Sequence, residues 1–203
     1  MALSRTEILN RMQDGTPWPK RLVIEPFFRA AVKEDDPSAS LDFHLGNRFT
    51  VLRSTRAADH NPLAEDPRKD VAASETFIPM GKEFTLHPGH IVLGTTLEWY
   101  RFPPDLLAYV MGRSIWGRRG LVIATALAVH PGSSGTITLE MANLGEVGLR
   151  LKPGALIGQL IFEQVSVVGI ETAARISPFS SASSPILGRY KRNPAEEMLL
   201  NLR

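Results

Sequence analysis

A glycine-rich basic turn at residues 112–120 precedes, by about two strands, a carboxylate at Glu140 that is framed by apolar residues. The turn reads Gly-Arg-Ser-Ile-Trp-Gly-Arg-Arg-Gly, with cations at Arg113, Arg118 and Arg119. Glycines let backbone amides approach a phosphate, guanidinium groups pair with its oxygens, and a serine hydroxyl can hold water or phosphate. Together they supply an anion-binding segment and a candidate general base, as a nucleotide-modifying site requires. Taken alone, a basic turn is more often an ordinary surface loop.

The segment that carries Glu140 alternates as a strand does. The alternation separates an apolar set, Ile137, Leu139 and Met141, from a polar set, Thr136, Thr138 and Glu140. If the polar face meets bulk water, Glu140 is an ordinary exposed strand residue. If it lines a cleft, the carboxylate can serve as a general base with a nearby arginine positioning it. The residues alone leave both interpretations open.

Several chemistries are excluded by residue types that the sequence lacks. The chain has no cysteine, which excludes disulfides, thiolate zinc sites and the zinc-deaminase signature. It has no Walker loop, Gly-x-Ser-x-Gly elbow or Gly-x-Gly-x-x-Gly turn. His87 and His90 form one close histidine pair, but a metal site needs further ligands, so we interpret Pro88-Gly89 between them as a turn joining two strands.

Composition is that of an ordinary globular protein. The chain of 203 residues is 43% hydrophobic and 22% charged, and we expect one domain over residues 1–203. A net charge of +2 does not favour wrapping nucleic acid, so phosphate binding must be local. The first residues have no apolar core of signal-peptide length, and no stretch approaches the roughly 20 apolar residues of a membrane span. We therefore expect a soluble cytoplasmic protein that does not bind membranes.

The chain opens on a predicted amphipathic helix. Ser4 and Glu7 have the spacing of a capping box, and Ile8, Leu9 and Met12 follow on one face.

Short apolar runs then recur, and Gly or Pro separates nearly all of them. The runs cover residues 22–28, 40–49, 77–80, 83–86, 90–97, 106–111, 121–126, 136–141, 148–151 and 158–162. Because no helical pattern of crossover length separates these strands, we predict an all-β fold, a sandwich or barrel with a short N-terminal helix and a few helical turns.

Two segments lack this pattern. Residues 53–75 are polar without a hydrophobic period, which predicts a surface excursion. Near the C-terminus, residues 177–184 are serine-rich and residues 188–193 are basic, followed by a predicted helical turn or two over residues 195–202.

Five motifs, in order and over nearly the whole chain, resemble the dCTP deaminases, relatives of the trimeric dUTPases. They are Asp42-Phe-His-Leu-Gly46, Phe84-Thr-Leu-His-Pro-Gly89 with Gly94-Thr-Thr-Leu-Glu98, the turn from Gly112 to Arg118, Thr138-Leu139-Glu140, and Pro153-Gly154 with Ile157-Gly158-Gln159-Leu160. The resemblance implies a distorted β-barrel or sandwich of the dUTPase-like (β-clip) type. It also implies a homotrimer with active sites between subunits.

The resemblance further implies metal-free deamination of dCTP to dUTP and ammonia. Glu140 would activate a water for attack on C4 of the cytosine, and Ser114 and the backbone near Ala126 would hold that water. Arg118 would orient Glu140 and keep it ionised. Backbone groups from Thr138 to Glu140 would read the pyrimidine edge.

The same resemblance implies a pyrimidine nucleoside triphosphate as the partner, with Mg²⁺ on its phosphates rather than at the chemistry. The residues implied to bind the nucleotide are Arg113, Ser114, Ile115, Trp116, Gly117, Arg118, Ala126, His130, Thr138, Leu139, Glu140, Gln159, Phe179, Arg189, Tyr190 and Asn193. The last four belong to a tail, at about residues 178–203, that we expect to act as a flexible lid over the bound nucleotide.

The chain departs from the family pattern at the turn before Glu140. Where relatives have Asp-Pro-Gly-aromatic-x-Gly, the sequence reads His130-Pro-Gly-Ser133-Ser-Gly135. The missing Asp holds the deoxyribose hydroxyl in relatives and activates the hydrolytic water in dUTPases, and the missing aromatic crowds out a 2'-hydroxyl. Ser133 therefore predicts a changed sugar preference. The tail also differs, with Arg189 and Asn193 in place of Lys and Gln, and Phe179 in place of Tyr.

Three functions remain compatible with these residues. The first is a cytosine-nucleotide deaminase, because Ser114, Arg118 and Glu140 all survive. The second is a nucleotide-binding or regulatory protein with little turnover, since losing a sugar anchor misplaces the substrate. The third is a pyrimidine nucleotide diphosphatase with a relocated base.

Overall fold

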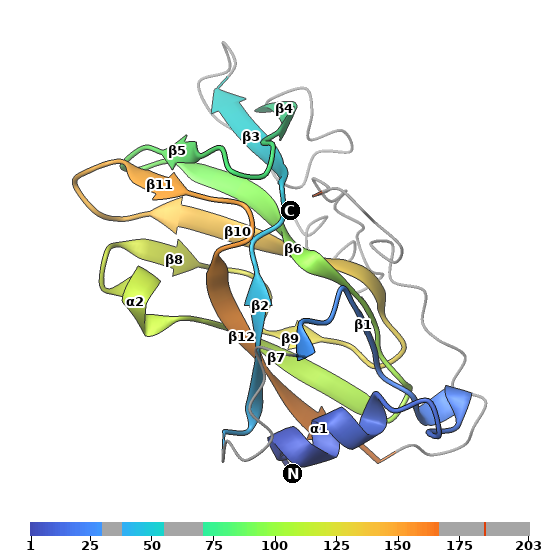
Figure 1. The fold of residues 1–203 in the computed structure, drawn as a ribbon. Coiled ribbons are helices and arrows are strands. Elements are labelled where there is room, and N and C mark those ends of the chain that lie inside the picture. The colour runs from blue at the N-terminus through green and yellow to red at the C-terminus, as the bar shows by residue number, and fades with distance from the viewer. Residues whose placement is uncertain (30–37, 55–70, 167–184, 186–203) are drawn as a thin grey trace, which may run out of the picture.

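The computed structural model describes residues 1–29, 38–54, 71–166 and 185, and these form a mostly β structure with short helices (Figure 1). The elements are α1 (Arg5–Arg11), η1 (Trp18–Lys20), β1 (Val23–Glu25), β2 (Ser40–His44), β3 (Arg48–Ser54), β4 (Val71–Phe77), β5 (Phe84–Leu86), β6 (Ile91–Arg101), β7 (Leu106–Gly112), α2 (Ser114–Gly117), β8 (Leu121–Ile123), β9 (Ala128–Val129), β10 (Ser134–Asn143), β11 (Leu149–Leu151) and β12 (Leu156–Gln164). The predicted all-β class is confirmed.

Within the described residues the strands form three sheets. A 6-stranded sheet has the order β4-β3-β6-β10-β8, with β1 also pairing β6. A 4-stranded sheet has the order β2-β12-β7-β9, and β11 pairs β5. The apolar core lies between the two larger sheets, because Leu139 and Met141 of β10 join one cluster with Leu160 and Phe162 of β12. None of the described helices is long and apolar enough to cross a bilayer.

Helix α1 begins at the predicted capping box. The Ser4 hydroxyl accepts a hydrogen bond from the Glu7 backbone N–H at 3.3 Å, and the Glu7 carboxylate accepts one from the Ser4 N–H at 2.7 Å. Both bonds satisfy N–H groups that a helix start leaves free. Ile8 and Leu9 are buried and Met12 packs against the core, as predicted.

A buried polar contact joins β2 to β6. The Glu98 carboxylate, whose side chain is 4% exposed, lies 2.6 Å from Nδ1 of His44 and accepts from the His44 backbone N–H at 3.1 Å. Sequence analysis assigned Glu98 no partner. The contact holds two strands of different sheets together at the edge of the core.

Several predicted boundaries are wrong. The outer parts of the predicted excursion at 53–75 belong to β3 and β4, which pair with Arg53 opposite Ala72. These strands were missed because the residues of β4 that are described are exposed or half-buried and show no hydrophobic period. Residues 78–80 are not a strand, since Pro79 accepts a turn hydrogen bond from Lys82.

Two other predicted strands have different bounds in the structure. The run at 40–49 is divided into β2 and β3 around Gly46, where the backbone lies so close to β6 that an added Cβ would stand 2.6 Å from the Thr95 hydroxyl. The run at 121–126 ends as a strand at Ile123. The predicted turns at 195–202 lie outside the described residues.

Candidate active site

Strand β10 presents Glu140 on the face opposite the core. Ile137, Leu139 and Met141 are 9%, 0% and 0% exposed, whereas Thr138 and Glu140 are half-buried. The predicted alternation is therefore confirmed. Glu140 is in register with Leu93 of β6, so a carboxylate is held at a fixed point near the centre of the 6-stranded sheet.

The hydroxyl of Thr125 fixes the backbone on which Glu140 sits. It accepts a hydrogen bond from the Glu140 N–H at 2.9 Å and donates to the Thr138 carbonyl at 3.3 Å. The Ala124 N–H also donates to the Glu140 carbonyl at 2.7 Å. Sequence analysis named Ala126 but missed Thr125, although a hydroxyl next to the predicted water-holding backbone was a usable signal.

The basic turn forms the short helix α2. Arg113 precedes it in extended conformation, its N–H donates to the Ile157 carbonyl at 3.1 Å, and the Arg118 N–H donates to the Ser114 carbonyl at 2.9 Å. Nε1 of Trp116 donates to the Leu156 carbonyl at 2.8 Å, which ties the turn to β12. Ser114 and Arg118 are exposed, so both side chains are free to meet a ligand or another chain.

Two polar residues of β2 support the predicted phosphate-binding side chains. Nη1 of Arg113 lies 3.0 Å from the Asp42 carboxylate without hydrogen-bond geometry, so the contact is one of charge rather than a directed bond. The Ser40 hydroxyl donates to Oε1 of Gln159 at 3.2 Å, and Asp42 is in register with Gln159. Sequence analysis missed these roles of Asp42 and Ser40 because strand pairing, not spacing, brings the residues together.

Asn143 and Gly120 set the path from α2 into β8. The buried Asn143 amide donates to the Leu86 and Val147 carbonyls at 2.9 and 2.8 Å, and its oxygen accepts from the Gly145 N–H at 2.9 Å. Gly120 has φ +93°, and a Cβ there would stand 2.6 Å from the Gly145 nitrogen. Only glycine fits this close approach, so the length of the turn before β8 is fixed.

The basic turn and Glu140 lie apart within one protomer. Among the described residues, no hydrogen bond or ion pair joins Glu140 to Ser114 or Arg118. Strand β8 starts opposite Asn143, three residues beyond Glu140 along β10, which corresponds to about 10 Å. The predicted pairing of Arg118 with Glu140 is thus not made inside a single chain.

Of the predicted residues near the sugar and in the tail, the structure describes only His130. His130 is exposed and starts the turn into β10, in which the Ser133 N–H donates to the His130 carbonyl at 3.2 Å and the Ser133 carbonyl accepts from the Phe102 N–H at 2.8 Å. Phe179, Arg189, Tyr190 and Asn193 lie outside the described residues.

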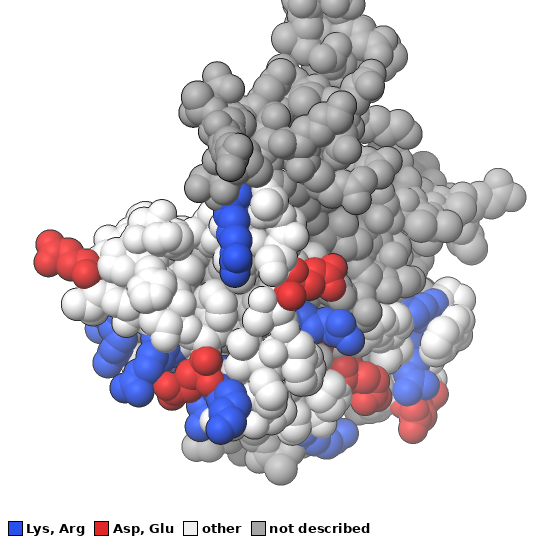
Figure 2. Space-filling view, turned by 90° about the horizontal axis from the view of Figure 1, so that it is seen from above, with Lys and Arg blue, Asp and Glu red and all other residues white. Residues whose placement is uncertain are grey.

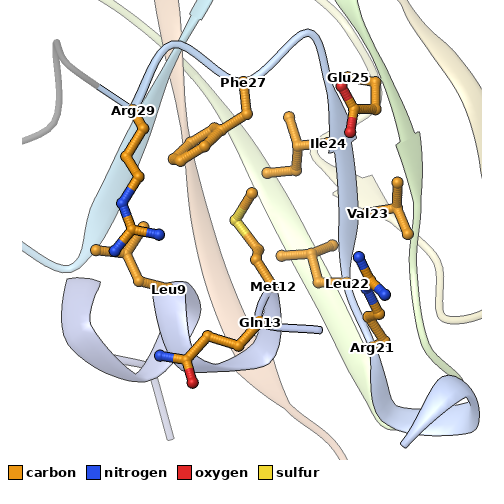
Figure 3. Close-up of a pocket in the computed structure, with 10 residues that line it drawn as sticks. All are labelled: Leu9, Met12, Gln13, Arg21, Leu22, Val23, Ile24, Glu25, Phe27 and Arg29. Carbon is orange, nitrogen blue, oxygen red and sulfur yellow. The ribbon is translucent and has the colours of Figure 1, made fainter. Parts of the chain in front are cut away.

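On the face seen in Figure 2, basic and acidic side chains of the described residues are interspersed. A cavity of about 150 Å³ lies between α1 and β1, where Leu9, Met12 and Phe27 line it with Arg21 and Arg29 (Figure 3). It contains none of the predicted site residues.

The described residues thus form a mostly β structure that presents a carboxylate-bearing strand and a separate basic turn. The family model described as "dCTP deaminase-like" matches residues 2–165. The chain therefore belongs to the dCTP deaminase-like family.

Named relatives agree with this assignment. A dCTP deaminase of Halorubrum lacusprofundi is 45% identical over 166 residues, covering 81% of this chain and 78% of the relative. A protein of Halobacterium salinarum named "dCTP deaminase, dUMP-forming" is 41% identical over 167 residues, covering 82% of each chain.

A solved structure shares the fold. The 2'-deoxycytidine 5'-triphosphate deaminase of Agrobacterium tumefaciens superposes with a TM-score of 0.54 at 17% identity. The match covers 81% of this chain and 46% of that one, so this chain spans about half of that protein's length.

Proposed function

We propose that this protein deaminates dCTP to dUTP and ammonia without a metal at the reacting centre. The observation that carries the proposal is Glu140, half-buried at the centre of β10 on the face opposite the core, in a chain that belongs to the dCTP deaminase-like family. Relatives at 45% and 40% identity are named dCTP deaminases, which supports dCTP as the substrate.

In the proposed reaction Glu140 takes a proton from a water, and the resulting hydroxide adds to C4 of the cytosine. The Glu140 carboxylic acid then gives this proton to N3 of the ring, which received the electron pair of the C4–N3 double bond. Glu140 next carries the proton of the C4 hydroxyl to the 4-amino group, the C4–N bond to that group breaks, and ammonia leaves as the C4 carbonyl forms. Ser114 and the backbone at Ala126 hold the water. Thr125 keeps Glu140 and Thr138 at a fixed spacing, since its hydroxyl bonds to both backbones.

The active site is completed by a second subunit of a homotrimer. Ser114 and Arg118 are exposed and are not bonded to Glu140 among the described residues of one protomer, which supports a site in which a neighbouring chain brings its basic turn to the carboxylate. Apolar side chains beside both half-sites support such an interface, because Ile115 and Leu127 are 53% and 66% exposed.

The triphosphate is bound by the basic turn together with Gln159. Asp42 and Ser40 limit the rotamers of Arg113 and Gln159 through the contacts described above, so these side chains are held before substrate arrives. Mg²⁺ accompanies the phosphates, whose oxygens are ligands of the kind that it prefers. Arg189, Tyr190 and Asn193 would contribute from the C-terminal segment.

The sugar is the least constrained part of the substrate. Ser133 stands where the family pattern has an aromatic ring that would exclude a 2'-hydroxyl, and its backbone groups are bonded to His130 and Phe102. A second substrate, CTP, is favoured by this change and by His130 in place of the sugar-binding carboxylate.

The test is to incubate the purified protein with dCTP, CTP and 5-methyl-dCTP and to measure ammonia release and product mass for each. We expect ammonia from dCTP, together with turnover of CTP within about tenfold of that of dCTP, because a missing steric contact discriminates weakly. A strong preference for unmodified dCTP over CTP would refute the relaxed sugar selectivity. Tight binding without ammonia, or release of diphosphate without ammonia, would refute the deaminase itself.

A further inference from the structure

Strand β6 bulges where it pairs with the strand that carries Glu140. Residues 96–98 of β6 stand opposite one residue of β10, Ile137, because the pairing shifts by two positions there. Without the shift Glu140 would lie opposite Thr95, whereas in the structure it lies opposite Leu93. The bulge therefore displaces the carboxylate by two residues, about 7 Å, along β6.

The Thr96 hydroxyl lies inside this bulge. It accepts a hydrogen bond from the Ile137 N–H at 3.0 Å and donates one to the Glu98 carbonyl at 2.8 Å. Thr96 is 1% exposed and Ile137 is 9% exposed, so bulk water does not compete for this N–H. The hydroxyl thus joins the bulged part of β6 to β10 at the residue where their regular pairing is interrupted.

The bulge is held from its other side by β2 and the turn after it. The Glu98 carboxylate accepts a hydrogen bond from the His44 N–H at 3.1 Å, and the Thr95 carbonyl accepts one from the Gly46 N–H at 2.7 Å. These contacts fix the bulged part of β6 without the help of β10. The strand that can shift at this point is therefore β10, and the Thr96 hydroxyl restrains it.

A second threonine hydroxyl holds the next part of β10. Thr125 is bonded to the Thr138 carbonyl and to the Glu140 N–H. The backbone from Ile137 to Glu140 is thus held by two hydroxyls from different segments, with Thr96 bonded before Thr138 and Thr125 bonded after it. Because Ile137 and Glu140 are three positions apart on one strand, a displacement at the first changes where the carboxylate of the second points.

We propose that Thr96 is a positioning residue for the deamination, whose hydroxyl holds β10 at the bulge and thereby sets the place of the Glu140 carboxylate. The inference rests on the proposed function for its effect on turnover, but the hydrogen bond to Ile137 is testable without substrate. Loss of the hydroxyl leaves the bulge in place and lets β10 move at Ile137, which misplaces the base relative to the water and to C4 of the cytosine.

The experiment compares Thr96→Val, which is close in shape but has no hydroxyl, with Thr96→Ser, which retains it. Thr96→Ala takes the place of the valine variant if that protein does not fold. The first readout is hydrogen exchange of the Ile137 amide in the ligand-free full-length protein, with the amides of β12 as the reference for global opening. Losing one buried hydrogen bond should accelerate exchange at Ile137 about fivefold relative to β12 in Thr96→Val, and Thr96→Ser should stay near wild type.

The second readout is steady-state deamination of dCTP. We expect kcat to fall about tenfold in Thr96→Val while KM changes by less than about threefold, because Glu140 acts on substrate that is already bound. Thr96→Ser should keep most of the wild-type kcat.

Ile8→Val is the matched control for a general loss of stability. Ile8 is 0% exposed in α1, which is not part of the 6-stranded sheet. Removing one buried methylene there should lower the melting temperature. The kcat of this variant should stay near wild type, since the bulge and β10 are unchanged.

Wild-type kcat in a folded Thr96→Val protein would overturn the proposal, as would an equal loss of kcat in Ile8→Val. Exchange at Ile137 that accelerates no more than exchange in β12 would overturn it as well. If the wild-type protein releases no ammonia, the proposed function fails, and the exchange rates then decide whether Thr96 holds β10.

Discussion

Glu140 depends on Thr125 for its position more than on any neighbour that sequence analysis named. The Thr125 hydroxyl is bonded to the backbone on both sides of Leu139, at 2.9 Å to the Glu140 N–H and 3.3 Å to the Thr138 carbonyl. One hydroxyl thus fixes the spacing between the proposed general base, Glu140, and the backbone proposed to read the pyrimidine. Such fixed geometry is what a reaction at a single ring carbon requires.

Replacing Thr125 by valine should lower kcat about tenfold or more, because the Glu140 N–H loses its acceptor and the strand can shift. Steady-state ammonia release from dCTP measures the change. Thr125→Ser keeps the hydroxyl and should retain most of the activity. Wild-type kcat in Thr125→Val would show that the hydroxyl does not position Glu140.

At the scale of elements, β12 contains Gln159 and also contacts the chain's N-terminus through Glu163. The Glu163 carboxylate lies 3.1 Å from the Met1 ammonium and accepts a hydrogen bond from the Tyr109 hydroxyl at 2.9 Å. The Tyr109 hydrogen bond, followed by the ammonium, lowers the pKa of Glu163. The same contact raises the pKa of Tyr109. β7, β12 and the N-terminus are thereby joined at the end of the sheet remote from α2.

The free energy of unfolding should decrease in acid, because protonation of Glu163 removes its favourable contacts. Because its folded-state pKa is lowered, the contribution is present above its unfolded pKa and is lost as the pH falls through the folded value. Melting temperatures between pH 7 and pH 3 should therefore decline more steeply for wild type than for Glu163→Gln, which preserves side-chain size. Parallel declines in the two proteins would contradict this linkage.

The sequence predicted those elements whose evidence is local. The capping box of α1 and the alternation of β10 each lie within a few residues, and both are confirmed. The pairing of β3 with β4 was missed because the described residues of β4 are exposed or half-buried and show no apolar period. The contact of Ser40 with Gln159 spans 119 residues and follows from strand pairing, which spacing along the chain does not reveal.

At the scale of the whole molecule, we propose a trimer in which Glu140 of each subunit meets the basic turn of a neighbouring subunit. Gly120 and Asn143 fix the turn at the far end of β8, about 10 Å along the sheet from Glu140. We propose on these grounds that the two half-sites of one active site belong to different subunits. The resemblance to the family implies the trimer, and we propose it here because no hydrogen bond or ion pair joins Arg118 to Glu140 among the described residues of one chain.

Two inactive variants should therefore complement each other. Glu140→Gln and Arg118→Ala are each expected to be inactive alone, but co-expressed chains form some sites with an intact Glu140 and an intact Arg118. In randomly mixed trimers about one quarter of the sites are complete, so activity should approach about one quarter of wild type. Mixtures that stay inactive while trimers form would contradict sites shared between subunits.

The most direct test of the central claim is the mass of the product that the purified protein forms from dCTP, with Glu140→Gln assayed beside it. The account predicts a product about one dalton heavier than dCTP that retains all three phosphates, released with one equivalent of ammonia, and none from Glu140→Gln. A product that has lost diphosphate while keeping its amino group, or full deamination by Glu140→Gln, would contradict it.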